Sequence, residues 1–559
     1  MSASSNGNHT RNATMASVLS ETTVSPTASG FTQDDKEDMP GIYPPSHPYR
    51  TLVLCFDGTG DQFDADNSNI VQLFGALKKD DNEQQLVYYQ AGIGTYTSPE
   101  IATPLRAKLS KTIDMAIGWY LSAHVMGGYE FLMQNYRAND RICIFGFSRG
   151  AYTARSLAGM INKVGILPAC NHQQVPFAYK IFSQDNERGK YQAGLFKKTF
   201  SVDAQIEFVG VFDTVSSIGI ISRTLPFTTS NNQIKTFRHA LSLDEHRAKF
   251  RPAFAGHLVI ESSPEHPQED DNPSTHNHKY IYLPKHHPRN AHEQQYWKDP
   301  KENTNVEEVW FAGCHCDVGG GSVANYETTN LARIPLRWMI RECFKNNTGI
   351  LFHGDILWEL GLDPDALGPD YIRPLPVPVP SSAYIQPIPR PPKGCNFKRP
   401  PVPKRDSSKT EEELDLEDAL SPKYDQLKLA LPWWILEMWP LTYKCHVAKT
   451  DGKDQDVTNY RRRMLGLIGW KGKDQGDSKE KDQGNTKENL KTVTKWRINV
   501  GRGRKIPVQS DGAKLKVHRT VQMRTKAYVE DPKKNPKKKD LKKYHPKAKV
   551  DLNDVIWVD

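Results

Sequence analysis

The chain has 559 residues, of which 25% are charged and 38 are proline, and its mean hydropathy is −0.64. These values fit one large α/β domain with polar insertions and tails. They exclude a chain in which nearly all residues belong to a compact apolar core. The net charge of +9 is concentrated near the C-terminus, where Lys533 to Lys549 contain nine lysines and one aspartate.

The N-terminal segment 1–48 is rich in Ser, Thr, Asn and Gly, so we expect a disordered tail and no secretory signal. No stretch is long and apolar enough to span a bilayer, the nearest being Leu429 to Leu441. The eight cysteines are scattered and several fall in predicted strands, which favours free thiols in a reducing compartment. We therefore expect a cytoplasmic protein whose contact with anionic membranes, if it makes any, is peripheral.

The first predicted strand, Thr51 to Phe56, is an apolar run that ends at the loop Asp57-Gly58-Thr59-Gly60. An aspartate-nucleophile phosphatase is excluded here, because such enzymes need D-x-D before G-T and Cys55 occupies the first position. A second strand is predicted at Leu86 to Tyr89, and an amphipathic helix at about Thr112 to Tyr136.

A strand, a tight turn and a helix are predicted between Arg141 and Val164. Residues 142–145 form an apolar run, as expected for a strand buried on both faces. The next five residues, GFSRG from Gly146 to Gly150, match G-x-S-x-G, the nucleophile elbow that lifts a serine hydroxyl above a sheet. The helix from Ala151 onward offers N–H donors at its N-terminus to developing negative charge. The flanking strand and helix favour a functional elbow over a chance match.

Two later strands are predicted to end at candidate catalytic residues. Ile206 to Phe212 ends at Asp213, and Val306 to Cys314 ends at His315. Between them, the run RHALSLDEHR from Arg238 to Arg247 has the pattern of a charged helix, so its two histidines are expected to be structural.

The predicted fold class is α/β: an α/β-hydrolase-like, doubly wound and mostly parallel sheet with long polar insertions and disordered tails. In such sheets ligands bind outside the carboxyl ends of the strands. Ser148, Asp213 and His315 fall at that end and follow the chain order Ser, acid, His of α/β-hydrolases. We predict Ser148 as the nucleophile, His315 as the general base and acid, and Asp213 as the carboxylate that orients the imidazole.

Alternatives remain open for two members of this triad. Asp317 is an alternative carboxylate, in which case Asp213 caps the helix after its strand. His518, on a late predicted strand, is an alternative base. Asp57 is expected to shape its loop through hydrogen bonds and not to react.

The oxyanion is expected to bind the N–H of Arg149, with a second donor from Gly58 or Thr59. No metal or cofactor is predicted, because Cys314-His315-Cys316 lacks the two residues that usually separate paired cysteines in zinc sites.

Around a predicted catalytic domain at 49–346, the rest of the chain is expected to form insertions and extensions. Two strands are predicted in the C-terminal extension and are expected to close the fold: Trp496 to Val500, followed by the basic turn Gly501 to Arg504, and Leu515 to Arg524. The segments are a lid-like insertion at 262–294, a Pro-rich linker at 368–404, a C-terminal extension packed on the hydrolase domain at 405–528 with low complexity at 471–488, and a Lys-rich tail at 529–559.

Five motifs together resemble one family: FDGTG from Phe56, GFSRGAYTAR from Gly146, GVFDTVSS from Gly210, RHALSLDEHR from Arg238 and FAGCHCDVGGG from Phe311. On these motifs, residues 49–345 are similar to the domain-of-unknown-function 2235 family, whose bacterial relatives include type VI secretion phospholipase effectors. The resemblance implies an α/β-hydrolase fold, a triad that falls by motif on Ser148, Asp213 and His315, and esterase or phospholipase activity. The low-complexity insertions suggest a fungal member that acts inside its own cell.

The leading functional hypothesis is a serine carboxylester hydrolase that acts through an acyl-enzyme on a phospholipid or another ester. The alternative is a catalytically silent binding or scaffold protein on the same fold, with the Pro-rich and Lys-rich segments as partner sites. No specific nucleic acid partner is expected, because that hypothesis rests on the composition of the Lys-rich tail alone.

Overall fold

The computed structural model describes residues 41–58, 61–92, 109–184, 186–215, 225, 231, 233–255, 259–261, 280–282, 304–389, 408–430, 433–438, 441–448, 490–506, 514–530 and 541–559. Most of the predicted N-terminal tail, most of the lid-like insertion and the low-complexity segment 471–488 lie outside these ranges.

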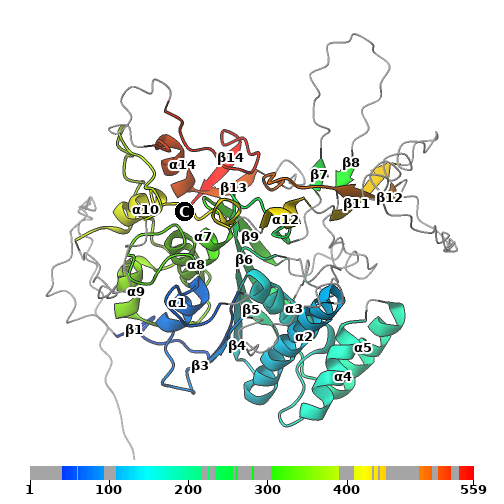
Figure 1. Ribbon diagram of the computed structural model, residues 1–559. Helices are drawn as coiled ribbons and strands as arrows, with labels where there is room; N and C mark the ends of the chain where they lie inside the picture. Colours follow the sequence, from blue (N-terminus) through cyan, green and yellow to red (C-terminus); the bar gives the residue numbers. More distant parts are fainter. Residues whose placement is uncertain are drawn as a thin grey trace, which may run out of the picture.

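A parallel sheet of eight strands forms the centre of the molecule (Figure 1). Its strands are β2 (Thr51–Phe56), β3 (Gln85–Gln90), β4 (Arg141–Phe147), β5 (Ile206–Phe212), β6 (Ile234–Ser242), β9 (Asn305–Phe311), β13 (Leu515–His518) and β14 (Val555–Val558). The order β14-β13-β9-β6-β5-β4-β2-β3 means that the chain runs from β2 out to the edge strand β3 and then crosses back to β4. Ligands bind at such a reversal in doubly wound sheets, so the carboxyl ends of β2 and β4 are the expected site.

Helices cover both faces of this sheet (Figure 1). The helices on one face are α2 (Leu109–Asn135), α3 (Ser148–Val164), α4 (Val175–Phe182) and α5 (Glu187–Phe200), and those on the other are α1 (Asn69–Ala76), α8 (Arg333–Lys345) and α9 (Gly354–Leu360). Among the helices that the structure describes, none is both long enough and apolar enough to cross a membrane.

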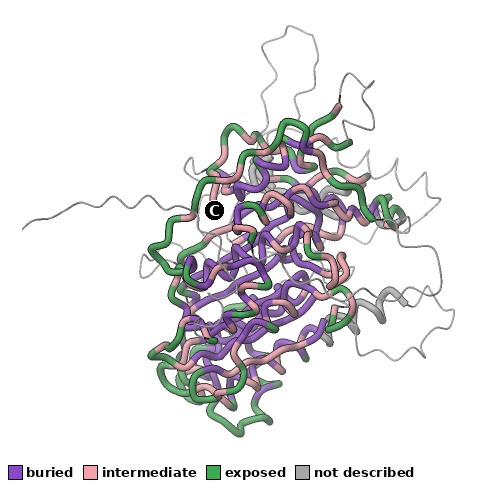
Figure 2. The backbone as a smooth tube through the Cα atoms, turned by 90° about the vertical axis from the view of Figure 1, so that its left-hand side faces the viewer, coloured by how far each residue is buried: buried purple, intermediate pink, exposed green. Residues whose placement is uncertain are grey.

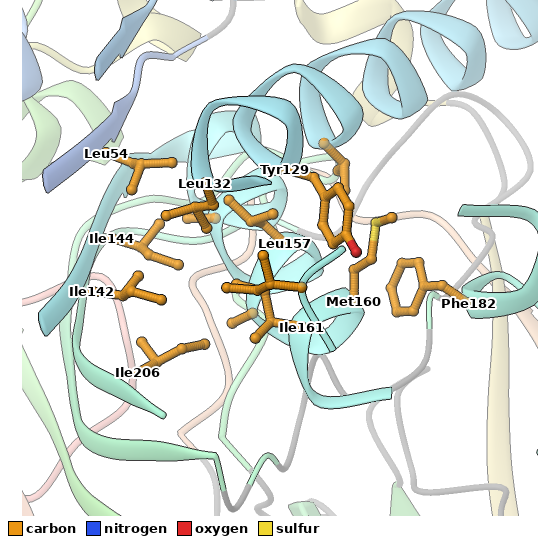
Figure 3. Close-up of a cluster of buried hydrophobic side chains, with 14 of the residues drawn as sticks. Leu54, Tyr129, Leu132, Ile142, Ile144, Leu157, Met160, Ile161, Phe182 and Ile206 are labelled. Atoms are coloured by element: carbon orange, nitrogen blue, oxygen red, sulfur yellow. The ribbon is translucent and has the colours of Figure 1, made fainter. Parts of the chain in front are cut away.

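The centre of the molecule is buried (Figure 2). The central strands are buried because each of their faces meets a different apolar cluster. Leu54 and Ile144 point to the layer of α2 to α5, where they meet Leu157 of α3 (Figure 3). Their chain neighbours Val53 and Cys143 point to the cluster of α1, α8 and α9. Two buried faces explain why the interiors of β2 and β4 are apolar runs without polar alternation.

Shorter elements surround the main sheet. One small sheet pairs β1 (Ile42–Tyr43) with β10 (Phe352–His353), and a second has the order β12-β11-β8-β7, with bounds β12 (Leu490–Arg497), β11 (Leu441–Ala448), β8 (Tyr280–Tyr282) and β7 (Val259–Glu261). The short helices are η2 (His172–Gln174), α7 (His315–Gly319), η3 (Pro364–Ala366), α10 (Glu411–Ala419), α11 (Gln426–Leu429), α12 (Trp433–Glu437) and α14 (Arg519–Lys526).

The prediction of a charged helix at Arg238 to Arg247 is wrong, because its first half belongs to β6 in the middle of the sheet. The polar side chains of this strand are paired with distant partners. Arg238 Nε lies 2.6 Å from Glu342 Oε2, and His239 Nδ1 lies 2.9 Å from Glu308 Oε1. Polar residues that are paired inside a protein give a strand the same sequence pattern as a solvated helix.

The C-terminal part of the chain continues the main sheet, since β13 pairs with β9 and β14 pairs with β13. The predicted strand at Leu515 to Arg524 is wrong beyond His518, where α14 begins. The His518 side chain accepts a hydrogen bond from the N–H of Thr520 and so caps the helix.

Buried ion pairs join α10 to the catalytic region. Arg337 Nη2 of α8 lies 2.7 Å from Asp415 Oδ1 and 2.6 Å from Asp418 Oδ2, and all three side chains are buried. Removing one partner of such a pair leaves an uncompensated buried charge, so residues 411–419 are integral to the folded domain.

The two elbow glycines pack against backbone. A Cβ on Gly146 would lie 2.6 Å from Cα of Ala151, and a Cβ on Gly150 would lie 2.3 Å from the carbonyl oxygens of both Phe56 and Asp57. Heavy atoms do not approach this closely without contact strain. Gly146 therefore lets β4 turn tightly into α3, and Gly150 lets the start of α3 pack against the end of β2 and the residue after it.

We predict that Gly150→Ala lowers the free energy of unfolding by about 1–3 kcal/mol, because the added methyl group overlaps backbone atoms. Gly194→Ala in α5 is the matched control, since nothing lies within 4 Å of its added Cβ. Gly194→Ala should leave the free energy of unfolding unchanged or raise it by up to about 1 kcal/mol. Denaturant unfolding measures both, and equal stability of the two variants would contradict the proposed close packing.

Candidate active site

Ser148 follows β4 directly and begins α3, at the carboxyl end of a central strand. Its φ of 58° lies in the left-handed region, which residues other than glycine rarely adopt. Asp213, which follows β5, also has a positive φ, 40°. Such strain persists where the surrounding structure holds a side chain in a required direction, so both conformations point to a functional site.

The structure brings Ser148, Asp213 and His315 together at the carboxyl ends of β4, β5 and β9. His315 Nε2 lies 2.8 Å from Ser148 Oγ, and His315 Nδ1 lies 2.5 Å from Asp213 Oδ2. A carboxylate accepts hydrogen bonds, so Nδ1 carries the proton and Nε2 is free to accept the serine hydroxyl. All three side chains are buried. This is the chain of hydrogen bonds that serine hydrolases use.

Two aromatic rings and a carboxylate fix the position of His315. The rings of Phe147 and Phe250 both have their centroids 4.8 Å from the imidazole centroid. The backbone N–H of His315 donates to Glu245 Oε2 at 3.2 Å, and Arg247 in turn donates to both oxygens of Glu245. The imidazole is therefore held by packing as well as by hydrogen bonds.

Burial and neighbouring charges shift the pKa values of the triad. Burial lowers the pKa of the His315 imidazole, and the hydrogen bond and charge of Asp213 offset this effect only in part. Burial alone would raise the pKa of the Asp213 carboxyl, but Arg504 and His315 outweigh it and hold the pKa well below its usual range. Near neutral pH Asp213 is therefore charged and His315 neutral, which is the state that a general base requires.

Arg504 is a residue of the site that the sequence did not assign. Its Nη1 donates to Asp213 Oδ1 at 2.5 Å and its Nη2 donates to Asp213 Oδ2 at 2.8 Å, across 291 positions of the chain. One feature of the sequence is related to this contact, namely the basic turn from Gly501 to Arg504. Nothing in a turn of this kind indicates which carboxylate it reaches.

The turn that carries Arg504 is fixed by Glu437, the last residue of α12. Glu437 Oε2 accepts from Asn499 Nδ2 at 2.7 Å and from the N–H of Gly501 at 2.9 Å. Glu437 is 1% exposed, so these bonds replace water around a buried carboxylate.

His246 fixes the same turn from the segment after β6. Its Nδ1 lies 3.0 Å from the carbonyl oxygen of Gly501, and its Nε2 lies 2.8 Å from Asp425 Oδ1. Both partners are acceptors, so the ring donates from both nitrogens and carries a positive charge. Burial lowers the pKa of His246, but Asp425 and the Gly501 carbonyl outweigh it and the pKa is raised.

The structure does not bring the alternative residues into the triad. Asp317 Oδ2 accepts from the N–H of Cys314 at 2.8 Å and so caps α7, and burial raises its pKa to about 7. His518 bonds to Thr520 and stacks on Phe311, and burial lowers its pKa to about 3. Neither side chain has a hydrogen bond to Ser148 or His315 within the described part of the chain.

Asp57 organises the loop after β2. Its carboxylate accepts from the N–H of Gly58 at 2.8 Å, from Ser68 Oγ at 2.6 Å and from the Tyr89 hydroxyl at 2.8 Å. Burial raises the pKa of Asp57 above its usual value despite these three donors. Because three donors bind its carboxylate, Asp57 holds the loop after β2 in shape.

Two of the three predicted oxyanion donors, Arg149 and Gly58, belong to the described part of the chain. The N–H of Arg149 is in the first turn of α3, where the helix itself supplies no acceptor. The N–H of Gly58 already donates to Asp57, and a Cβ on Gly58 would lie 2.7 Å from the Phe147 ring, so this loop touches the elbow. Thr59 lies outside the described residues. Within the described ranges, no group of His, Cys, Asp and Glu side chains is arranged to hold a metal ion.

A family model described as the catalytic domain of the Tle1-like phospholipase effectors of the type VI secretion system matches residues 50–342. The matched region contains Ser148, Asp213 and His315 and ends well before Arg504.

Individual proteins are also similar to parts of the chain. The uncharacterized protein YEL023C of Saccharomyces cerevisiae is 39% identical over 229 residues, which are 38% of this chain and 33% of that protein. The chain therefore spans about a third of the length of this curated relative. An uncharacterized protein from Pseudomonas aeruginosa of known structure is 18% identical, with a TM-score of 0.28 over 54% of this chain and 46% of that one. The Tle1 effector bound to the VgrG spike is 19% identical, with a TM-score of 0.24 over 50% and 52% of the two chains.

We predict that the stability contributed by His246 depends on pH. Its pKa in the folded protein is raised above the unfolded value of about 6.5, so the contribution is fully present below that pH and is lost as the pH rises through the folded pKa. The difference in Tm between the wild type and His246→Gln should be largest in mildly acidic buffer and should shrink as the pH rises. His172→Gln, at an exposed position, is the control for the exchange of histidine for glutamine itself. A difference in Tm that stays constant with pH would contradict the charged ring.

Proposed function

This chain belongs to the family of Tle1-like phospholipase effector catalytic domains, and we propose that it is a serine hydrolase that cleaves carboxylic esters of lipids through an acyl-enzyme. The observation that carries the proposal is the contact of His315 with both Ser148 and Asp213, at 2.8 and 2.5 Å. The alternative of a silent binding protein on the same fold is an outcome of the test below.

In the proposed reaction, His315 Nε2 takes the proton of Ser148 Oγ as that oxygen attacks the carbonyl carbon of the ester. Asp213 stabilises the imidazolium that forms. The tetrahedral intermediate then collapses, the bond to the alcohol oxygen breaks, and the imidazolium gives its proton to the departing alkoxide. The acyl group stays on Ser148 until a water molecule, deprotonated by His315, releases it as a carboxylic acid and restores the hydroxyl.

The intermediate carries a negative oxygen that needs donors in place before the reaction. The N–H of Arg149 at the N-terminus of α3 is proposed as the first donor, since the dipole of this 17-residue helix also favours negative charge there. The loop after β2 is proposed to supply the second donor, and the packing of Gly58 against Phe147 supports this, although the Gly58 N–H itself donates to Asp57.

An apolar patch beside the site supports a lipid substrate. We use this name for Leu429, Trp434, Met438 and Val500, whose exposed fractions are 51%, 38%, 58% and 49%. Three of them are linked by hydrogen bonds, because Met438 N donates to the Trp434 carbonyl and Val500 N donates to the neighbouring Glu437 carbonyl. Trp434 Nε1 also donates to the carbonyl of Leu427, two residues before Leu429. Exposed clusters of large apolar side chains are typical of surfaces that bind proteins or membranes.

Aromatic rings connect the apolar patch to the triad. The Trp433 ring centroid lies 5.4 Å from that of Phe250, which lies 4.8 Å from His315. Lys428, with 74% of its side chain exposed, adds positive charge next to the patch. We propose that an anionic lipid surface occupies the patch, so that a cytoplasmic protein docks peripherally and presents lipid esters to Ser148.

We predict that Ser148→Ala lowers kcat on a phospholipid ester by a factor on the order of 10⁴ or more, because the nucleophile is lost. Ser156→Ala is the matched control, since this buried serine lies on the same helix and its hydroxyl donates to the Tyr152 carbonyl. The control should retain wild-type turnover. Fatty acid release from a panel of phospholipids and simple esters is measured. No turnover by the wild type on any member would favour the silent binding protein.

We predict that Leu429→Ser combined with Met438→Ser weakens binding to vesicles of phosphatidylcholine and phosphatidylserine about tenfold, since two exposed apolar side chains no longer leave water. Turnover on these vesicles should fall more than turnover of a water-soluble ester. Tyr191→Ser combined with Leu195→Ser removes comparable exposed side chains from α5 and should leave binding unchanged. Equal effects of the two double variants in vesicle sedimentation would contradict a specific patch.

A further inference from the structure

We propose that Arg504 is a positioning residue of the catalytic site, which fixes both oxygens of Asp213 and offsets part of the charge that Asp213 presents to His315. The proposal rests on the proposed function, because it assigns a role in the action of the same triad. It also makes the turn at 499–504 a part of the active site, although this turn lies outside the family-matched region 50–342.

The guanidinium of Arg504 is held by every one of its donors. Two N–H groups reach the two oxygens of Asp213 at 2.5 and 2.8 Å. Ser242 Oγ accepts at 2.8 Å, and the carbonyl oxygen of Phe250 accepts from Nε at 3.1 Å and from Nη2 at 2.7 Å. The side chain is 3% exposed. A planar fork bound on all sides fixes the plane of the carboxylate, which a flexible ammonium does not do.

The guanidinium of Arg504 also contacts Ser242 and Phe250, two residues that help to position Asp213 and His315. Ser242 donates its own N–H to Asp213 Oδ1 at 3.0 Å, and Phe250 packs against the His315 ring at 4.8 Å. Arg504 therefore contacts the carboxylate and the residues that position both the carboxylate and the imidazole. A change in its position is transmitted to the plane of Asp213 and to the ring of His315.

The turn at 499–504, which presents Arg504 to Asp213, contains an unfavourable backbone conformation. Val500 has a φ of 52°, a conformation that a β-branched residue rarely adopts. Glu437 compensates by accepting from Asn499 and Gly501, and His246 donates to the Gly501 carbonyl. A strained turn that several buried polar groups keep in place is expected where a side chain must be presented in one direction.

The shared oxygen of Asp213 has a chemical consequence. Asp213 Oδ2 accepts from both His315 Nδ1 and Arg504 Nη2. The positive charge of Arg504 weakens the attraction between Asp213 and a protonated imidazole, so His315 loses its proton at a lower pH than with a free carboxylate. The other charged groups around the ring are Glu245 and Arg247, which bond to each other. His315 is therefore available as a general base at a lower pH than it would be without Arg504.

Arg504→Gln, Arg504→Lys and Arg502→Gln test the proposal in the full chain. The pH dependence of kcat/KM is measured on an ester that the wild type hydrolyses. For Arg504→Gln we expect the acid limb to move up by about one pH unit and kcat to fall about tenfold. Arg504→Lys keeps the charge and should restore the position of the acid limb, with kcat still reduced. Arg502, exposed on the same turn, is the matched control and should leave the profile unchanged.

A titration that needs no turnover separates this proposal from the proposed function. The His315 resonance is followed by NMR in protein with ¹³C-labelled histidine and is assigned by its loss in His315→Gln. An upward shift of its midpoint in Arg504→Gln supports the role of Arg504 even if no ester is hydrolysed. Equal midpoints in the wild type and Arg504→Gln, with both folded, overturn it. If Arg504→Gln does not fold, Asn499→Ala loosens the turn and should give a smaller shift in the same direction, and no shift overturns the proposal.

Discussion

The buried carboxylate of Asp213 is the interaction on which the rest of this structure depends. A fully buried negative charge is unfavourable unless it is paired and hydrogen-bonded. Asp213 meets this requirement with the imidazole of His315 on one side and the guanidinium of Arg504 on the other. These two partners come from segments far apart in the chain, so one carboxylate joins the central sheet, the short helix α7 and the C-terminal turn.

The topology of the sheet explains why the site forms where it does. Parallel strands place all their carboxyl ends on one edge, and the crossover from β3 back to β4 leaves an opening at the ends of β2 and β4. Ser148, Asp213 and His315 come from three different strands that end there. The C-terminal extension adds β13 and β14 to the sheet beyond β9, at the far end of the strand order from β3. It therefore completes the domain that holds the triad, and its turn reaches into the site.

Most of this could be predicted from local sequence. The strands β2, β4 and β5 are mostly apolar, with Glu207 as the one charged residue inside β5, and the glycines around Ser148 mark a tight turn that only small residues permit. β6 could not be predicted, because its Arg238 and His239 are paired with Glu342 and Glu308, which lie far away in the chain. The Arg504 contact was missed for the same reason, since an ion pair across 291 positions leaves no local pattern. Helix α14 was missed because a histidine cap ends the strand before it.

Mass spectrometry of the protein after reaction with a fluorophosphonate tests the central claim most directly. The account predicts one adduct, on the tryptic peptide from Ile142 to Arg149 at Ser148, and a labelling rate that falls steeply in His315→Gln because the imidazole no longer removes the hydroxyl proton. An adduct on another serine, or labelling of Ser148 at the full rate without the imidazole of His315, would contradict it.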